Sequence, residues 1–97
     1  MKMSLFNSAE QFADYCYRQA ELIENNGLRI AKELYYKALE GEGKNDFLRT
    51  NNIPIDTDAA QRVWEQHIEW LEGDINYLEK KVRKYRRDAD RALQSIQ

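Results

Sequence analysis

The chain has 97 residues, of which 42% are hydrophobic and 33% are charged, and its formal net charge at pH 7 is −2. A core of this size is only marginally stabilising, so self-association or a bound partner would help the fold. The single cysteine, Cys16, excludes an internal disulfide, and we expect it to be a small core residue of a cytoplasmic protein. No hydrophobic run reaches the length of a signal peptide or a membrane span.

The first predicted element is a helix over residues 8–40, after a lead-in of residues 1–7. Ser8 and Gln11 have the spacing of a capping box, and Gly41-Glu42-Gly43 is typical of a helix stop. Asn25-Asn26-Gly27 is a turn signal, but the four-three spacing of the seam passes through it, so we predict one continuous helix. The seam consists mainly of small residues: Ala9, Ala13, Cys16, Ala20, Ile23, Gly27, Ile30 and Leu34.

A connection over residues 41–57 follows. It is unusually apolar, since it contains Phe47, Leu48, Ile53 and Ile55. We expect these side chains to pack back on the helices, with a short helical turn that starts at Asn45. The connection is therefore predicted to be ordered.

The second long helix is predicted over about residues 57–95, or 57–96 at its longest. Its cap would be Asp56, Thr57 or Asp58, after Pro54. Its apolar residues fill every core position of a heptad repeat, the pattern of a coiled coil. They are Trp64, Ile68, Leu71, Ile75, Leu78, Val82, Tyr85, Ala89, Ala92 and Ile96.

The short connection predicts that the two helices return antiparallel, as an all-α two-helix hairpin in a single domain of residues 1–97. The register with the shortest connection would place small residues against large ones. It pairs Gly27 with Leu71, Ala20 with Leu78, Cys16 with Val82, and Ala13 with Tyr85. A parallel homodimer of the second helix is the alternative, but it would bring Asp74 against Glu79 and Lys81 against Arg86.

One side of the predicted hairpin is aromatic and apolar, whereas the opposite side is acidic. We predict that this side binds a partner, because contiguous apolar patches mark interfaces. A second copy that completes a four-helix bundle, a different protein, or coverage by the connection could bury it. Its residues are Phe12, Tyr15, Leu22, Tyr36, Val63, His67, Trp70 and Tyr77. The predicted function is that of an adaptor, a chaperone-like subunit or a stoichiometric inhibitor of a larger protein.

A basic cluster between Lys80 and Arg91 suggests a different function. Seven of the chain's fifteen basic residues lie there. The alternative prediction is a nucleic-acid accessory protein. Its nucleic acid, or an acidic partner, would contact Lys80, Lys84, Arg87 and Arg91.

Motifs for chemistry are missing from the sequence. His67 has no histidine or cysteine at ligand spacing, and no phosphate-binding loop, nucleophile elbow or dinucleotide fingerprint occurs. We therefore expect no catalytic residue, no metal and no cofactor, and a protein that is not an enzyme.

Overall fold

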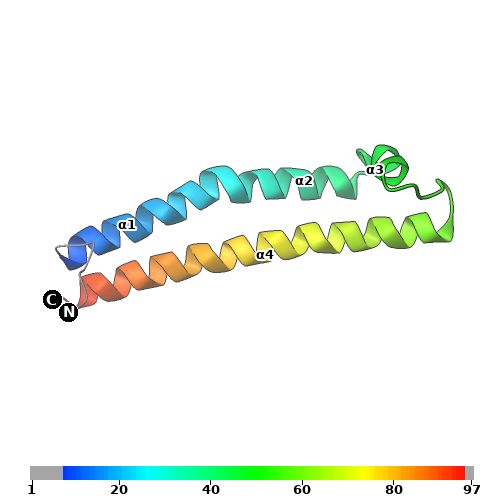
Figure 1. Ribbon diagram of the computed structural model, residues 1–97. Helices are drawn as coiled ribbons and strands as arrows, with labels where there is room; N and C mark the ends of the chain where they lie inside the picture. Colours follow the sequence, from blue (N-terminus) through cyan, green and yellow to red (C-terminus); the bar gives the residue numbers. More distant parts are fainter. Residues whose placement is uncertain (1–7, 96–97) are drawn as a thin grey trace. The chain divides into compact units, whose positions relative to one another are not determined.

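The computed structural model describes residues 8–95 and shows an all-α protein whose two long helical stretches pack antiparallel (Figure 1). The elements are α1 (Ala9–Leu22), the π-helix η1 (Ile23–Leu28), α2 (Arg29–Leu39), α3 (Lys44–Thr50) and α4 (Asp58–Gln94). The predicted hairpin is confirmed, and its two long helices end within two residues of the predicted bounds. The predicted lead-in 1–7 and the last seam residue, Ile96, lie outside the described residues.

Local signals place the helix ends where the sequence predicts them. The backbone N–H of Gln11 donates to Ser8 Oγ at 3.2 Å, which caps α1. At the end of α2, Gly41 has a φ of +83°, and N–H groups of Gly41 and Glu42 donate to carbonyls of Ala38 and Lys37. This arrangement is a Schellman motif. Thr57 is the cap of α4, because its Oγ1 accepts from the N–H of Ala60 at 3.0 Å.

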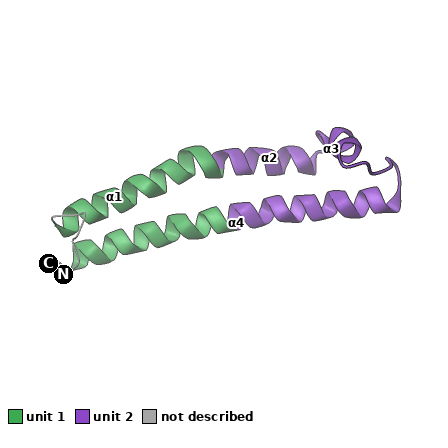
Figure 2. Ribbon diagram, viewed as in Figure 1, with its two compact units in different colours: residues 1–28, 77–97 green, residues 29–76 purple. Residues whose placement is uncertain are grey.

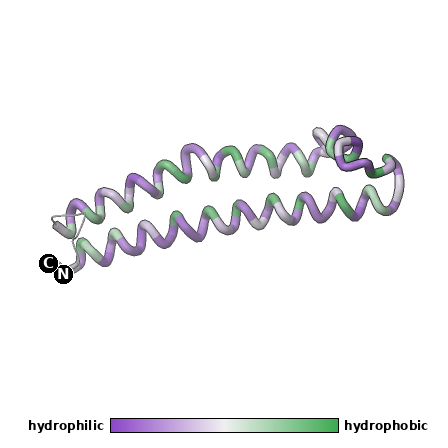
Figure 3. The backbone as a smooth tube through the Cα atoms, in the orientation of Figure 1, coloured by the Kyte–Doolittle hydropathy of each residue, from purple (hydrophilic) through white to green (hydrophobic). Residues whose placement is uncertain are grey.

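The chain divides into two compact units (Figure 2). Unit 1 consists of residues 1–28 and 77–97, and unit 2 of residues 29–76. The helix α4 is uninterrupted and contributes residues to both. Hydrophobic residues recur along the long helices at short intervals (Figure 3), as amphipathic helices require.

The core of unit 1 consists of small side chains. Ala13 and Cys16 of α1 and Ala89 of α4 are buried, and larger residues surround them: Phe12, Tyr85, Ala92 and Leu93. Small residues at the contact allow two helices to approach closely. Burial, together with the negative charge of Asp88, raises the pKa of the Cys16 thiol, as suits the predicted core cysteine.

The predicted register is wrong by one heptad. A Cβ atom on Gly27 would lie 3.9 Å from Cδ1 of Leu78, not against Leu71. In the same unit, Arg86 of α4 forms an ion pair with Glu24 of η1. A heptad shift preserves the match of core positions, so the seams alone could not choose between the two registers.

The shift is accompanied by a connection that folds into α3 instead of taking the shortest path. Leu48 of α3 has no exposed surface, and the rings of Phe47 and Trp64 meet edge to face at 5.6 Å. Lys44 Nζ donates to Gln61 Oε1 at 3.0 Å. The first turns of α4 thus pack against α3 in unit 2. The predicted ordered connection with a short helix is confirmed.

The helix is continuous through Asn25-Asn26-Gly27, as predicted, but the predicted phase is wrong. These residues lie in η1, where Asn26 Nδ2 donates to the carbonyl of Leu22 at 3.1 Å. A π-turn inserts one extra residue, so positions after it rotate by about one residue. The buried residues that follow are accordingly Leu28 and Ala38, with Tyr35 half-buried. Ile30 and Leu34, predicted to be core, are each 51% exposed.

Candidate protein-interaction surface

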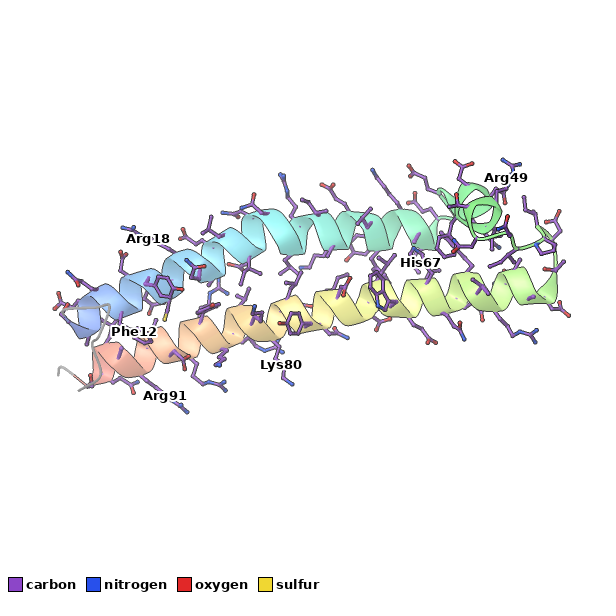
Figure 4. All side chains as sticks on the ribbon, viewed as in Figure 1. Phe12, Arg18, Arg49, His67, Lys80 and Arg91 are labelled. Atoms are coloured by element: carbon purple, nitrogen blue, oxygen red, sulfur yellow. The ribbon has the colours of Figure 1, made fainter. Side chains whose placement is uncertain are left out.

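Aromatic rings of α3 and α4 form a cluster in unit 2. The imidazole of His67 stacks on Phe47, with ring centroids 4.4 Å apart, and lies 5.2 Å from Trp64. On its other side, at 6.4 Å, is the nearly parallel ring of Trp70. Figure 4 shows His67 on α4, level with the end of α2. Since His67 spaces Trp70 from the core rings, Trp70 lies at the edge of the cluster.

The cluster forms one wall of an open groove with a volume of about 490 Å³. Leu34 of α2 also lines the groove, as do the charged residues Lys37 and Glu42. Trp64 is buried at 6% exposure, whereas Trp70 is 65% exposed. The groove is therefore lined by both buried and exposed apolar side chains, which is the usual composition of a binding site.

The predicted partner-binding residues divide equally between the units. Tyr36, Val63, His67 and Trp70 belong to unit 2, and Phe12, Tyr15, Leu22 and Tyr77 belong to unit 1. The groove brings His67 and Trp70 together, but Tyr36 and Val63 do not line it. Tyr36 is 60% exposed, with its ring 5.7 Å from that of Tyr35, and Val63 is half-buried.

Sequence reasoning missed the groove residues other than His67 and Trp70. Among them, it assigned Leu34 to the core and Phe47 to the connection. The π-turn exposes Leu34, and α3 carries Phe47 to the wall of the groove. The sequence contains a signal for the exposure of Leu34, because Asn25-Asn26-Gly27 is a poor α-helical sequence. The seam pattern correctly predicted that the helix continues through Asn25-Asn26-Gly27. It did not predict which residues face the core after that point.

In unit 1, a smaller hollow of about 210 Å³ holds two of the predicted aromatic residues. Phe12 and Tyr15 line it together with Tyr85, Lys81 and Lys84. Phe12 is half-buried and Tyr15 is 41% exposed. Leu22 and Tyr77, at 54% and 60% exposure, lie outside this hollow.

The predicted basic cluster is exposed on α4. Lys80, Lys84, Arg87 and Arg91 are all exposed, and in Figure 4 Lys80 and Arg91 extend away from α1. The Nζ of Lys81 lies 5.4 Å from the centre of the Tyr77 ring, a cation–π contact. Residues 80–91 hold seven basic and two acidic side chains, whereas residues 58–79 hold one basic and six acidic ones. The charge of α4 is thus strongly segregated along its length.

Comparison with known proteins gives no further guide: no protein-family profile, no curated protein and no solved structure matches the chain significantly. Within residues 8–95, no helix is both long and apolar enough to cross a bilayer.

Proposed function

We propose that the protein is a non-enzymatic protein–protein interaction module. It would act as an adaptor, a chaperone-like subunit or a stoichiometric inhibitor of a larger protein, by covering part of that protein's surface. The observation that supports the proposal is the apolar groove of unit 2, whose lining residues Leu34 and Trp70 are 51% and 65% exposed. Apolar side chains gathered around a groove are typical of a binding surface.

Trp70 is the proposed anchor. A fully buried tryptophan removes about 200 Å² from water. Because about two thirds of Trp70 is still exposed, a partner that covers it would gain about 3 kcal/mol at roughly 25 cal/mol per Å². Tryptophan is also enriched among residues that dominate interface energies.

A capture experiment tests this proposal. The full-length chain is used to capture partners from its native host, and captured proteins are compared between Trp70→Ala and Tyr36→Ala. Tyr36 is a matched control, because it is an equally exposed aromatic residue that does not line the groove. We expect Trp70→Ala to lose the partner and Tyr36→Ala to retain it. Equal capture by both variants would refute the groove as the binding surface.

We place the module in the cytoplasm as part of the proposal. Its one cysteine is a buried free thiol, which suits a reducing compartment.

A nucleic-acid accessory protein is the second candidate. The exposed cations Lys80, Lys84, Arg87 and Arg91 support it. Salt-sensitive retention on DNA or RNA that is abolished by Lys84→Glu with Arg87→Glu would favour this candidate. Retention unchanged by this double substitution would exclude the cluster as the contact.

A further inference from the structure

Within residues 8–95, no other part of the chain packs against Gly73. It lies near the middle of α4, and a Cβ atom placed on it meets nothing within 4 Å. Glycine inside an α-helix costs about 1 kcal/mol relative to alanine. Within the described residues, neither close packing nor a left-handed backbone requires a glycine at position 73.

A stripe of exposed residues runs along α4 on both sides of Gly73. Because its members are spaced by four and three residues, they share one face of the helix. Trp70 and Tyr77, exposed at 65% and 60%, lie on either side of the glycine. The stripe contains Gln66, Trp70, Gly73, Tyr77, Lys80 and Lys84, all of them exposed.

The charges of α4 indicate what could cover this stripe. Residues 58–79 are acidic and residues 80–91 are basic, so the helix is electrostatically complementary to an antiparallel copy of itself. A parallel copy would instead place acidic against acidic and basic against basic residues. An antiparallel pair related by a two-fold axis uses the same patch on both copies.

We propose that the exposed stripe of α4 is a self-association surface on which a second copy of the chain docks antiparallel, with its Tyr77 over Gly73. Because Gly73 has no side chain, it leaves a hollow on the surface of α4. The phenol ring of Tyr77 of the second copy fills this hollow. The two-fold axis makes the contact reciprocal. In this register Trp70 lies opposite Lys80 of the second copy, a cation–π arrangement.

The flanking charges agree with this register only in part, because Arg62 comes level with Arg87 of the second copy. Glu69 lies beside Arg83 of the second copy, and among residues 8–95 neither side chain takes part in an ion pair. Asp74 and its copy approach each other near the axis, which weakens the dimer.

The inference rests on the proposed function in one respect, because the second copy covers Trp70 and so competes with any other partner for it.

The first test is the mass in solution, measured by sedimentation equilibrium of the full chain from low to high micromolar concentration. We expect a monomer–dimer equilibrium. Gly73→Leu should keep or raise thermal stability, since the site is open, and should weaken the dimer at least about tenfold. A dimer that survives Gly73→Leu unchanged, or a monomer at every concentration, overturns the proposal.

A charge exchange tests the register. Glu69→Arg and Arg83→Glu should each weaken the dimer, and the double variant should restore it. Asp74→Asn should strengthen it by removing the repulsion. The matched control is Glu21→Arg, which makes the same charge change on α1 and should leave the dimer intact. If the double variant is no better than the single ones, the antiparallel register is wrong.

The capture experiment separates the two proposals. A chain that stays monomeric but still loses its partner with Trp70→Ala refutes self-association and supports the interaction module. A chain that dimerises as described but captures nothing through Trp70 supports self-association and refutes the module. Association that requires added DNA or RNA overturns the self-association proposal in favour of the nucleic-acid candidate.

Discussion

Tyr17 Oη donates a hydrogen bond to Asp90 Oδ1 at 2.5 Å, which joins α1 to α4 in unit 1. This hydrogen bond, then loss of hydration, and then the negative charge of Asp90 raise the pKa of the Tyr17 phenol above the ordinary value of 10.0. All three effects favour the protonated phenol, which is the form that can donate.

Tyr17 should therefore titrate later than an ordinary tyrosine. Its raised pKa means that the hydrogen bond contributes its full stability below the unfolded-state pKa of about 10, and that this contribution is lost as pH rises through the folded-state pKa. An ultraviolet titration of the folded chain should show a late tyrosine that is missing from Tyr17→Phe. If Tyr17→Phe leaves the late titration in place, the hydrogen bond does not form in solution.

Leu48 should be essential for stability although it lies in the connection. Because its side chain is fully buried, Leu48→Ala should lower the free energy of unfolding by about 2–5 kcal/mol. Leu39→Ala serves as control, since Leu39 is 53% exposed, and should cost less than about 1 kcal/mol. Chemical denaturation measures both. If Leu48→Ala and Leu39→Ala lower the free energy of unfolding by similar small amounts, α3 does not pack on the long helices.

The π-turn sets which residues of α2 face water, and cysteine labelling can measure this. In a Cys16→Ala background, Leu34→Cys should react with a maleimide much faster than Ala38→Cys, because Leu34 is 51% exposed and Ala38 is 4% exposed. An unbroken α-helical phase predicts slow labelling at position 34. Protection of Leu34→Cys would show that η1 is absent in solution.

Gly27→Ala should stabilise the protein, in contrast to Gly41→Ala. The added methyl of Gly27→Ala would be in ordinary contact with Leu78, at 3.9 Å, and should raise stability by about 0.5–1 kcal/mol. Gly41 has a φ of +83°, so Gly41→Ala should lower stability by about 1 kcal/mol or more. Thermal unfolding compares the two. Destabilisation by Gly27→Ala would mean that η1 and α4 are closer than described.

Helix ends could be predicted from the sequence because their causes are local. Ser8, Gly41 and Thr57 each determine a cap by their own side chain or backbone freedom. The register has a different cause. A heptad repeat matches itself after a shift of seven residues, and packing of Leu48 and Phe47 of α3 against the rest of unit 2 accompanies the observed choice. That packing cannot be read from the two seams.

The candidate interaction surface was predicted in part. Trp70 and Tyr77 lie outside the core positions of the heptad, so their exposure followed from periodicity alone. Leu34 could not be found in this way, because one extra residue in a helical turn moves every later position around the helix. Asn25-Asn26-Gly27 indicates where an extra residue could enter the helix. It does not indicate whether the helix breaks there or continues with a π-turn.

Tryptophan fluorescence tests most directly the claim that Trp70 is the anchor of an interaction surface. Trp64→Phe leaves Trp70 as the only tryptophan, and Trp70→Phe leaves the buried Trp64 as control. We predict that Trp70 is readily quenched by acrylamide in the dilute chain and becomes protected, with a blue-shifted emission, when the chain associates or binds its partner. Trp64 should not change. If Trp70 remains equally quenchable at every concentration and in every complex, it is not part of the interface.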